Sequence, residues 1–152
     1  MTAPRRRVEE LDVDSCLQLL EGRQVGRLAF VGAEGDPVVL PVNYVLDRGQ
    51  IVIRTAEGSK LAAAVAKARV AFEVDDFDKD LRTGWSVLVK GIADELWQST
   101  ELDLARRLPL QPWAPGEREH FILIMSTAIT GRRITTLEGP ALPPRATDLW
   151  FG

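Results

Sequence analysis

The chain has 152 residues, a formal net charge of −3, 45% hydrophobic residues and 27% charged residues. This length can bury a hydrophobic core without disulfides or metals, and the composition is ordinary for a soluble globular domain. The negative net charge argues against a nucleic-acid-binding protein, which needs a concentrated positive surface. No apolar run approaches the length of a membrane span, and no apolar signal segment follows Arg5-Arg6-Arg7. We therefore expect a cytoplasmic protein that binds neither nucleic acid nor membrane.

The residue types that most often bind metals or act as nucleophiles are scarce. Cys16 is the only cysteine and shares an apolar helical face with Leu17 and Leu20, so we expect it to be a small core residue. His120 is the only histidine, which leaves a metal site without its usual ligands and a Ser-His-Asp hydrolase without local support. We therefore predict no metal site.

The first elements expected in chain order are a helix and two strands. The helix should begin after an N-cap at Asp12 and end at Glu21-Gly22, where glycine can adopt the left-handed conformation. Val25 to Val31 and Val38 to Leu46 should be strands joined by a turn rich in glycine and proline. Pro41 cannot donate a ladder hydrogen bond, which predicts a sheet edge or a bulge at that residue.

The next strand, Ile51 to Thr55, leads into a helix with Ser59 at its N-cap. Free backbone N–H groups, the helix dipole, the Ser59 hydroxyl and the Lys60 ammonium would then meet in one small volume, which suits a phosphate monoester. Arg54 and Thr55 can reach the same volume from the strand end. The alternative interpretation is an ordinary helix cap with a solvated lysine.

Two more strand patterns follow this helix. Val70, Phe72 and Val74 alternate with polar or small residues, and the acidic run from Asp75 to Asp78 is expected to be a solvated loop. A second alternation begins at Trp85, and its apolar residues change parity at Gly91, which predicts a β-bulge there.

The last third of the chain predicts a short helix and the end of the sheet. Ser99 should cap a helix that runs to Arg107, and Phe121 to Met125 and Ile134 to Leu137 should be strands. Many short antiparallel strands with few helices predict a mainly β protein that closes into a small barrel. We expect one domain over residues 11–138, between a mobile N-terminal segment, residues 1–10, and a C-terminal tail, residues 139–152.

Several motifs in this order resemble the pyridoxamine 5′-phosphate oxidase-like family of flavin-binding split barrels. They are Gly26-Arg27-Leu28-Ala29, Pro41-Val42-Asn43-Tyr44, Arg54-Thr55, Gly58-Ser59-Lys60-Leu61 and Trp85-Ser86-Val87-Leu88-Val89-Lys90-Gly91. The likeness extends from about Leu11 to Ile134. It implies an antiparallel split β-barrel of the Greek-key type, a homodimer, and flavin mononucleotide (FMN) or a deazaflavin relative at the subunit interface.

The resemblance also implies roles for individual residues. The stretch beside the isoalloxazine ring would be Leu40, Pro41, Val42 and Asn43, with backbone and Asn43 amide groups at the polar edge of the ring. The phosphate would be held by Arg54, Thr55, Ser59 and Lys60. Trp85 and Ser86 occupy the strand position from which the family contacts the flavin. An equally good interpretation makes Trp85 a core aromatic on the face of Val87 and Val89.

Candidates for the substrate side are Trp113, in a proline-rich loop, and the pair Arg132 and Arg133. Their simpler interpretations are a loop anchor and a solvated turn. The segment from Pro140 to Gly152 does not resemble the C-terminal part with which true pyridoxamine phosphate oxidases hold their substrate. Vitamin B6 oxidation is therefore not expected.

The chemistry of a flavin needs few protein groups, because the cofactor itself carries the hydride or electron pair. The absence of a recognisable acid–base pair therefore leaves the catalytic residues unknown without excluding an enzyme. We expect an FMN-dependent oxidoreductase acting on a small molecule. The alternatives are a deazaflavin-dependent reductase and a non-catalytic protein that sequesters flavin or haem. Glu57 would repel the polyglutamyl tail of a deazaflavin, which favours FMN.

Overall fold

The computed structural model describes residues 4–54, 58–111 and 120–137, in which seven strands and three helices are present. The elements are β1 (Arg5–Leu11), α1 (Val13–Glu21), β2 (Val25–Val31), β3 (Pro37–Asp47), β4 (Gln50–Arg54), α2 (Gly58–Val65), β5 (Ala68–Asp78), β6 (Thr83–Glu95), α3 (Ser99–Arg106) and β7 (Phe121–Leu137). The sheet order is β1-β7-β4-β3-β2-β5-β6, every ladder is antiparallel, and β6 also pairs with β7. That pairing closes all strands except β1 into a barrel, so the predicted mainly β split barrel is confirmed.

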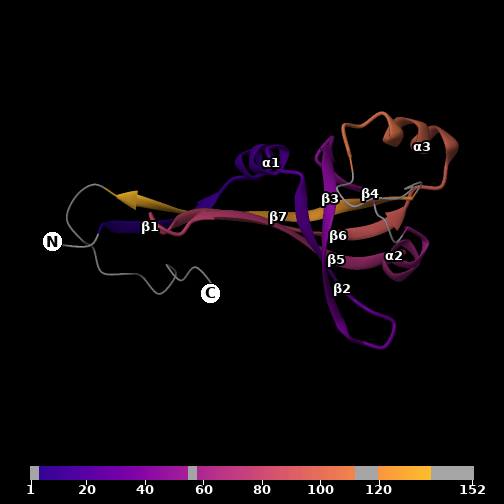
Figure 1. Cartoon of the computed structure of the whole chain (residues 1–152), viewed down its shortest axis with the longest axis horizontal. Coiled ribbons are helices and arrows are strands. Elements are labelled where there is room, and N and C mark those ends of the chain that lie inside the picture. Colours follow the sequence, from indigo (N-terminus) through magenta and orange to yellow (C-terminus); the bar gives the residue numbers. More distant parts are fainter. Residues whose placement is uncertain (1–3, 55–57, 112–119, 138–152) are drawn as a thin grey trace.

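The long strand β7 belongs to two parts of the molecule. Its first residues, from Phe121 to Ile124, pair with β4, while its last seven, from Gly131 to Leu137, pair with the whole of β1. Figure 1 shows β1 and the end of β7 leaving the barrel as a ribbon beside α1. The prediction of a mobile segment over residues 1–10 is therefore wrong for residues 5–10, because backbone ladders form whatever charges the side chains carry. The predicted turn at Arg132 and Arg133 is also wrong, since both lie inside β7.

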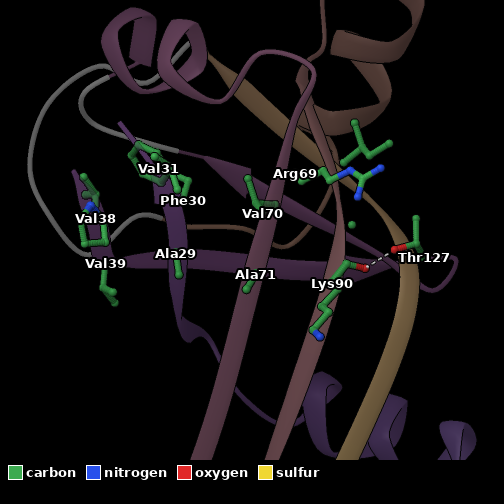
Figure 2. Close-up of a pocket in the computed structure, with 13 residues that line it drawn as sticks. Ala29, Phe30, Val31, Val38, Val39, Arg69, Val70, Ala71, Lys90 and Thr127 are labelled. Atoms are coloured by element: carbon green, nitrogen blue, oxygen red, sulfur yellow. Dashed lines mark hydrogen bonds between the residues drawn. The ribbon is translucent and has the colours of Figure 1, made fainter. Parts of the chain in front are cut away.

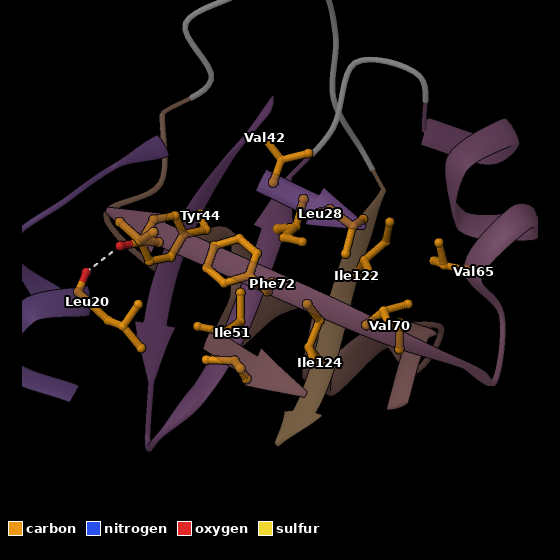
Figure 3. Close-up of a cluster of buried hydrophobic side chains, with 14 of the residues drawn as sticks. Leu20, Leu28, Val42, Tyr44, Ile51, Val65, Val70, Phe72, Ile122 and Ile124 are labelled. Carbon is orange, nitrogen blue, oxygen red and sulfur yellow. Dashed lines mark hydrogen bonds between the residues drawn. The ribbon is translucent and has the colours of Figure 1, made fainter. Parts of the chain in front are cut away.

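The barrel interior is filled by inward-facing residues of the strands and closed by α1 and α2. Figure 3 shows Phe72 beside Tyr44, whose rings meet edge to face with centroids 4.8 Å apart. The Tyr44 hydroxyl donates a hydrogen bond of 2.5 Å to the carbonyl of Leu20 in α1, and burial raises the pKa of this hydroxyl far above its usual value. Cys16 is fully buried in the same cluster, as predicted.

The helix boundaries agree with the predictions at one end of α1 and differ elsewhere. The Asp12 carboxylate accepts a hydrogen bond of 2.7 Å from the Ser15 backbone N–H, which confirms the N-cap. Gly22 has a φ of −79°, so the left-handed ending is wrong. The helix α2 begins at Gly58, which places Ser59 inside its first turn, and α3 has Gln98 at its N-cap in place of Ser99.

The strand predictions are correct in position and incomplete in extent. β5 continues to Asp78, so the acidic run is strand and not loop. β4 pairs with β3 only from Asn43 onward, so β3 is an edge at Pro41, as predicted.

A β-bulge lies at the predicted place, but its extra residue is in the other strand. The register of β6 and β7 shifts between Lys90 and Gly91, where β7 contains the unpaired Thr127. β6 keeps its parity, with Gly91 and Ala93 buried and Ile92 outward. The Thr127 hydroxyl donates a hydrogen bond of 3.2 Å to the Lys90 carbonyl. A Cβ atom at Gly91 would lie 2.3 Å from the Met125 carbonyl oxygen, so this close approach requires glycine.

Candidate functional site

The predicted site residues can be located by following the paired residues around the barrel. Arg54 at the end of β4 is the partner of Asn43, and Asn43 is the partner of Val25. Farther round, Ser86 pairs with Asp75 on one side and with Arg132 on the other. The β2–β5 ladder pairs Arg27 with Glu73. Two residues farther along each strand, the same register places Val25 opposite Asp75. We call this row the outer belt; its members are Arg54, Asn43, Val25, Asp75, Ser86 and Arg132.

The belt lies on the outside of the barrel. Directly paired residues of an antiparallel ladder project from the same face. The sequence neighbours of the belt, among them Ile53, Tyr44 and Val87, are buried in the barrel core. Since side chains alternate along a strand, the belt residues face outward.

The same alternation divides the residues expected beside the flavin ring. Pro41 and Asn43 face outward, whereas Val42 is buried in the core and Leu40 packs against it. Ser86 faces outward, whereas Trp85 packs against the core, as in the alternative interpretation, with the Arg23 guanidinium 5.5 Å from its ring centroid. The side chains of Leu40, Val42 and Trp85 are thus directed away from the belt, and only their backbone groups face a ligand there.

Two of the four residues expected to hold phosphate are described with their side chains. Arg54 places its guanidinium 5.3 Å from the centroid of the Phe121 ring. Lys60 is exposed in the first turn of α2, which begins four residues after the end of β4. Thr55 lies outside the described residues, and of Ser59 only the backbone, in the same turn of α2, is described. β4 and α2 therefore deliver one guanidinium and one ammonium from adjacent segments.

The three residues expected on the substrate side are not found together in the structure. Arg132 is on the belt beside Ser86 and lines a pocket of about 410 Å³ with Glu10 and Thr130. Arg133 pairs with Trp85 and so projects from the opposite face of the sheet. Trp113 lies outside the described residues.

Sequence reasoning missed a charged cluster in the middle of the barrel face. Nη1 of Arg27 lies 3.2 Å from Oε1 of Glu73 and 3.3 Å from Oδ2 of Asp75. Partial burial and the neighbouring Asp75 carboxylate raise the pKa of Glu73 to about 7. The signal in the sequence was two carboxylates at alternate positions of one strand, which places both on the same face. Both also line a pocket of about 490 Å³ that includes Ser86.

Two structural tests of other functions are negative within residues 4–54, 58–111 and 120–137. No group of three or more His, Cys, Asp or Glu side chains is arranged there to hold a metal ion. In the same ranges no helix combines the length and apolar character needed to cross a membrane.

A closed antiparallel barrel with one strand outside it defines a split-barrel protein. The chain belongs to the pyridoxamine 5′-phosphate oxidase family, whose model matches residues 12–133.

Relatives of known sequence or structure span nearly the whole chain. The uncharacterized protein Rv0080 of Mycobacterium tuberculosis is 36% identical over 134 residues, which are 85% of this chain and 87% of that protein. A Corynebacterium glutamicum protein named for the same family is 33% identical with a TM-score of 0.75, over 91% of this chain and 99% of that one. A FAD-binding protein of Mycobacterium smegmatis is 34% identical with a TM-score of 0.69, over 82% of this chain and 98% of that one.

Proposed function

We propose that this chain is a flavin-dependent oxidoreductase that acts on a small molecule, and that its cofactor is FMN bound at the outer belt of a homodimer. The observation that carries the proposal is the ladder pairing of Arg54 with Asn43, together with a helix, α2, that begins four residues after Arg54 and holds Lys60 in its first turn. The similarity to a FAD-binding protein at 34% identity supports a flavin.

The residues at this end fit a flavin phosphate. Two cations and the first backbone N–H groups of α2 can neutralise and bind a phosphate monoester. The side-chain amide of Asn43 donates a hydrogen bond of 3.4 Å to the Gln24 carbonyl, which orients it on the outer face. A side-chain amide offers donors and an acceptor of the kind that pair with the polar edge of an isoalloxazine ring. Bound FMN would supply the hydride or electron transfer.

The spacing of the belt supports a site shared between two copies of the chain. Along the belt, through β2 and β5, Asn43 and Ser86 are three strand positions apart, a path of about 14 Å at about 4.8 Å per strand. Val25 and Asp75 lie between them. A tricyclic ring held at Asn43 therefore does not reach Ser86 and Arg132 of the same chain. A second copy that presents these two residues would complete the site and add an arginine for an anionic substrate group.

FMN is favoured over FAD and a deazaflavin by the charged residues expected around the end of the cofactor that carries its phosphate. FMN ends in the monoester for which Arg54 and Lys60 provide charge, whereas a deazaflavin continues into a carboxylate-rich tail. In α2 and the residues after it, the next cations are Lys67 and Arg69, at the far end of the helix from Lys60. A FAD diphosphate carries two linked phosphates and would need further donors beyond Lys60.

A titration of the purified protein with each cofactor tests the proposal. FMN should bind more tightly than FAD or a deazaflavin, as measured by flavin fluorescence. The FMN-loaded protein, reduced with dithionite, should then be reoxidised faster by a small quinone or nitroaromatic compound than by buffer alone. Tighter binding of FAD or a deazaflavin would contradict the assignment of FMN as the cofactor. Flavin binding without acceleration by any acceptor of a broad panel would instead indicate a flavin carrier.

A further inference from the structure

A second hydrophobic cluster lies outside the barrel, beneath α3. Ile51 and Ile53 of β4 belong to the barrel core, whereas Val52 between them faces outward. Leu123 of β7, the ladder partner of Val52, faces outward with it. Ala105 of α3 is buried against this outer surface, and Figure 1 shows α3 outside the barrel on the side of β4.

α3 does not fill the space above these strands. A cavity of about 450 Å³ remains between the helix and the strands. Protein interiors leave few voids larger than a water molecule, whereas small-molecule pockets measure about 300–1,000 Å³. The apolar residues that line the cavity are Val52, Leu96, Leu104, Ala105, Leu108 and Leu123. The cavity is therefore large enough, and apolar enough, for the side chain or ring of a small molecule.

Charged side chains of both signs line the rest of the cavity. Asp47 and Arg48 come from the end of β3 and the turn that follows it. Glu101 and Arg107 come from the first turn and the C-cap of α3. Among the residues that the structure describes, none forms an ion pair with any of these four side chains. Two cations beside two anions favour a molecule that itself carries both charges.

The backbone of Arg48 is in a conformation that disfavours arginine. Its φ is 51°, and the φ of the following Gly49 is 77°. A two-residue hairpin turn with both φ angles positive is normally built from Asn, Asp or Gly, because other L side chains are strained there. An arginine in this strained position indicates that its side chain has a function.

We propose that the cavity beneath α3 binds a small zwitterion with an apolar side chain, of the chemical class of the aliphatic and aromatic α-amino acids. The apolar side chain lies against the outward residues of β4 and β7. The carboxylate accepts hydrogen bonds from Arg48 and Arg107, and the ammonium donates to Asp47 or Glu101.

This site is separate from the one proposed for the flavin phosphate. Gln50, which lines the cavity, and Arg54 are at opposite ends of β4, four residues or about 13 Å apart at about 3.3 Å per residue. The inference therefore goes beyond the proposed function and does not depend on it.

Another hollow of the barrel differs in its charges and provides a control. Figure 2 shows this groove, with Val39 on the side of the β2–β3 hairpin and Lys90 on the side of β6. Its charged lining residues are Arg69 and Lys90, both cations. It therefore suits an anion, whereas the cavity beneath α3 suits a zwitterion.

Three probes that share a phenyl ring test the charge requirement. L-Phenylalanine carries both charges, 3-phenylpropionate carries only the carboxylate, and 2-phenylethylamine carries only the ammonium. Isothermal titration of the full chain should show phenylalanine binding at least about tenfold more tightly than either other probe, because each of those lacks one charge-assisted contact. Equal binding of 3-phenylpropionate would overturn the zwitterion class. Loss of phenylalanine binding in Lys90→Ala would place the ligand in the groove of Figure 2 and overturn the site.

Arg48→Gly separates a ligand-binding role from a structural one. Glycine adopts a positive φ without strain, so this variant should stay folded with little change in its thermal midpoint. It should weaken phenylalanine binding at least about tenfold. The matched control is Arg82→Gly, because Arg82 has a φ of 53° in the turn between β5 and β6 and does not line the cavity. No loss in Arg48→Gly, or an equal loss in both variants, would overturn the site.

FMN titration of the same variants separates this inference from the proposed function. Arg48→Gly should bind FMN as tightly as the natural chain does. FMN binding without saturable binding of phenylalanine, leucine or tryptophan would reject this inference alone. Phenylalanine binding by a chain that binds no FMN would reject the flavin function alone.

Discussion

Gly131 of β7 lies directly against the sulfur of Cys16 in α1. A Cβ atom at position 131 would be 2.6 Å from Cys16 Sγ and 3.2 Å from the Ser86 carbonyl oxygen. The absence of a side chain at this residue lets α1 pack closely against β7 next to Arg132, a residue of the outer belt.

Gly131→Ala should therefore destabilise the protein by about 1–3 kcal/mol, because the added methyl overpacks a closed contact. Urea denaturation followed by circular dichroism measures this loss. Cys16→Ala in the same chain should recover part of it, since it removes the sulfur that the methyl meets. Additive losses in the double variant would mean that the two residues do not share this contact.

Glu73 should make the stability of the fold depend on pH. Its pKa rises from the ordinary 4.5 to about 7, first because the carboxyl is partly buried and second because of Asp75. Between about pH 4.5 and pH 7 the folded state thus holds a proton that the unfolded state has released. The contribution of Glu73 to stability is present below pH 4.5 and is lost as the pH rises through 7.

Glu73→Gln removes this titration while keeping the shape of the side chain. As the pH rises from 4.5 to 7.5, the natural chain should lose unfolding free energy that the variant keeps. The variant should therefore become progressively more stable relative to the natural chain. Denaturation midpoints at several pH values measure it. A constant difference over this range would show that Glu73 ionises in the folded state as in the unfolded one.

Local sequence patterns predicted most of the fold because most of its strands alternate in a regular way. Val25 to Val31 is a strand with the predicted bounds, and a bulge lies at the predicted Gly91, although β6 itself does not change parity there. The pattern could not show which strand holds the extra residue, because that depends on the partner strand. β1 was missed for a similar reason, since its pairing with β7 depends on backbone groups and leaves no apolar alternation in Arg5-Arg6-Arg7.

The sequence named candidate site residues but did not predict how they are arranged. Motif resemblance identified Asn43, Arg54 and Ser86, which the structure places on one belt. The same motifs could not say that Trp85 faces inward, because its alternation fits both faces until the core is known. Arg27 and Glu73 escaped notice because their contact joins residues far apart in the chain.

The phosphate assignment predicts a clear loss of affinity on removal of either cation. Arg54→Ala and Lys60→Ala should each lose a charge-assisted contact of roughly 1.5–3 kcal/mol, which weakens FMN binding about tenfold to a hundredfold. Lys67→Ala, at the far end of α2 from Lys60, removes a similar charge and serves as the control. Affinities equal to that of the control would reject this phosphate site. Riboflavin, which has no phosphate, should bind all variants alike.

A buried acid paired with a histidine should stabilise the far end of the barrel. The side chain of Glu95 at the end of β6 is 7% exposed, and its Oε1 contacts Nδ1 of His120, just before β7. His120→Ala removes this contact from a carboxylate that water scarcely reaches, which should cost about 1–3 kcal/mol of unfolding free energy. Adding Glu95→Leu should recover part of the loss, because an apolar side chain has no buried charge to satisfy. Arg106→Ala, which breaks an exposed ion pair with Asp103, should cost less than about 0.5 kcal/mol in the same urea titration. A double variant less stable than His120→Ala alone would show that Glu95 is held by contacts other than the histidine.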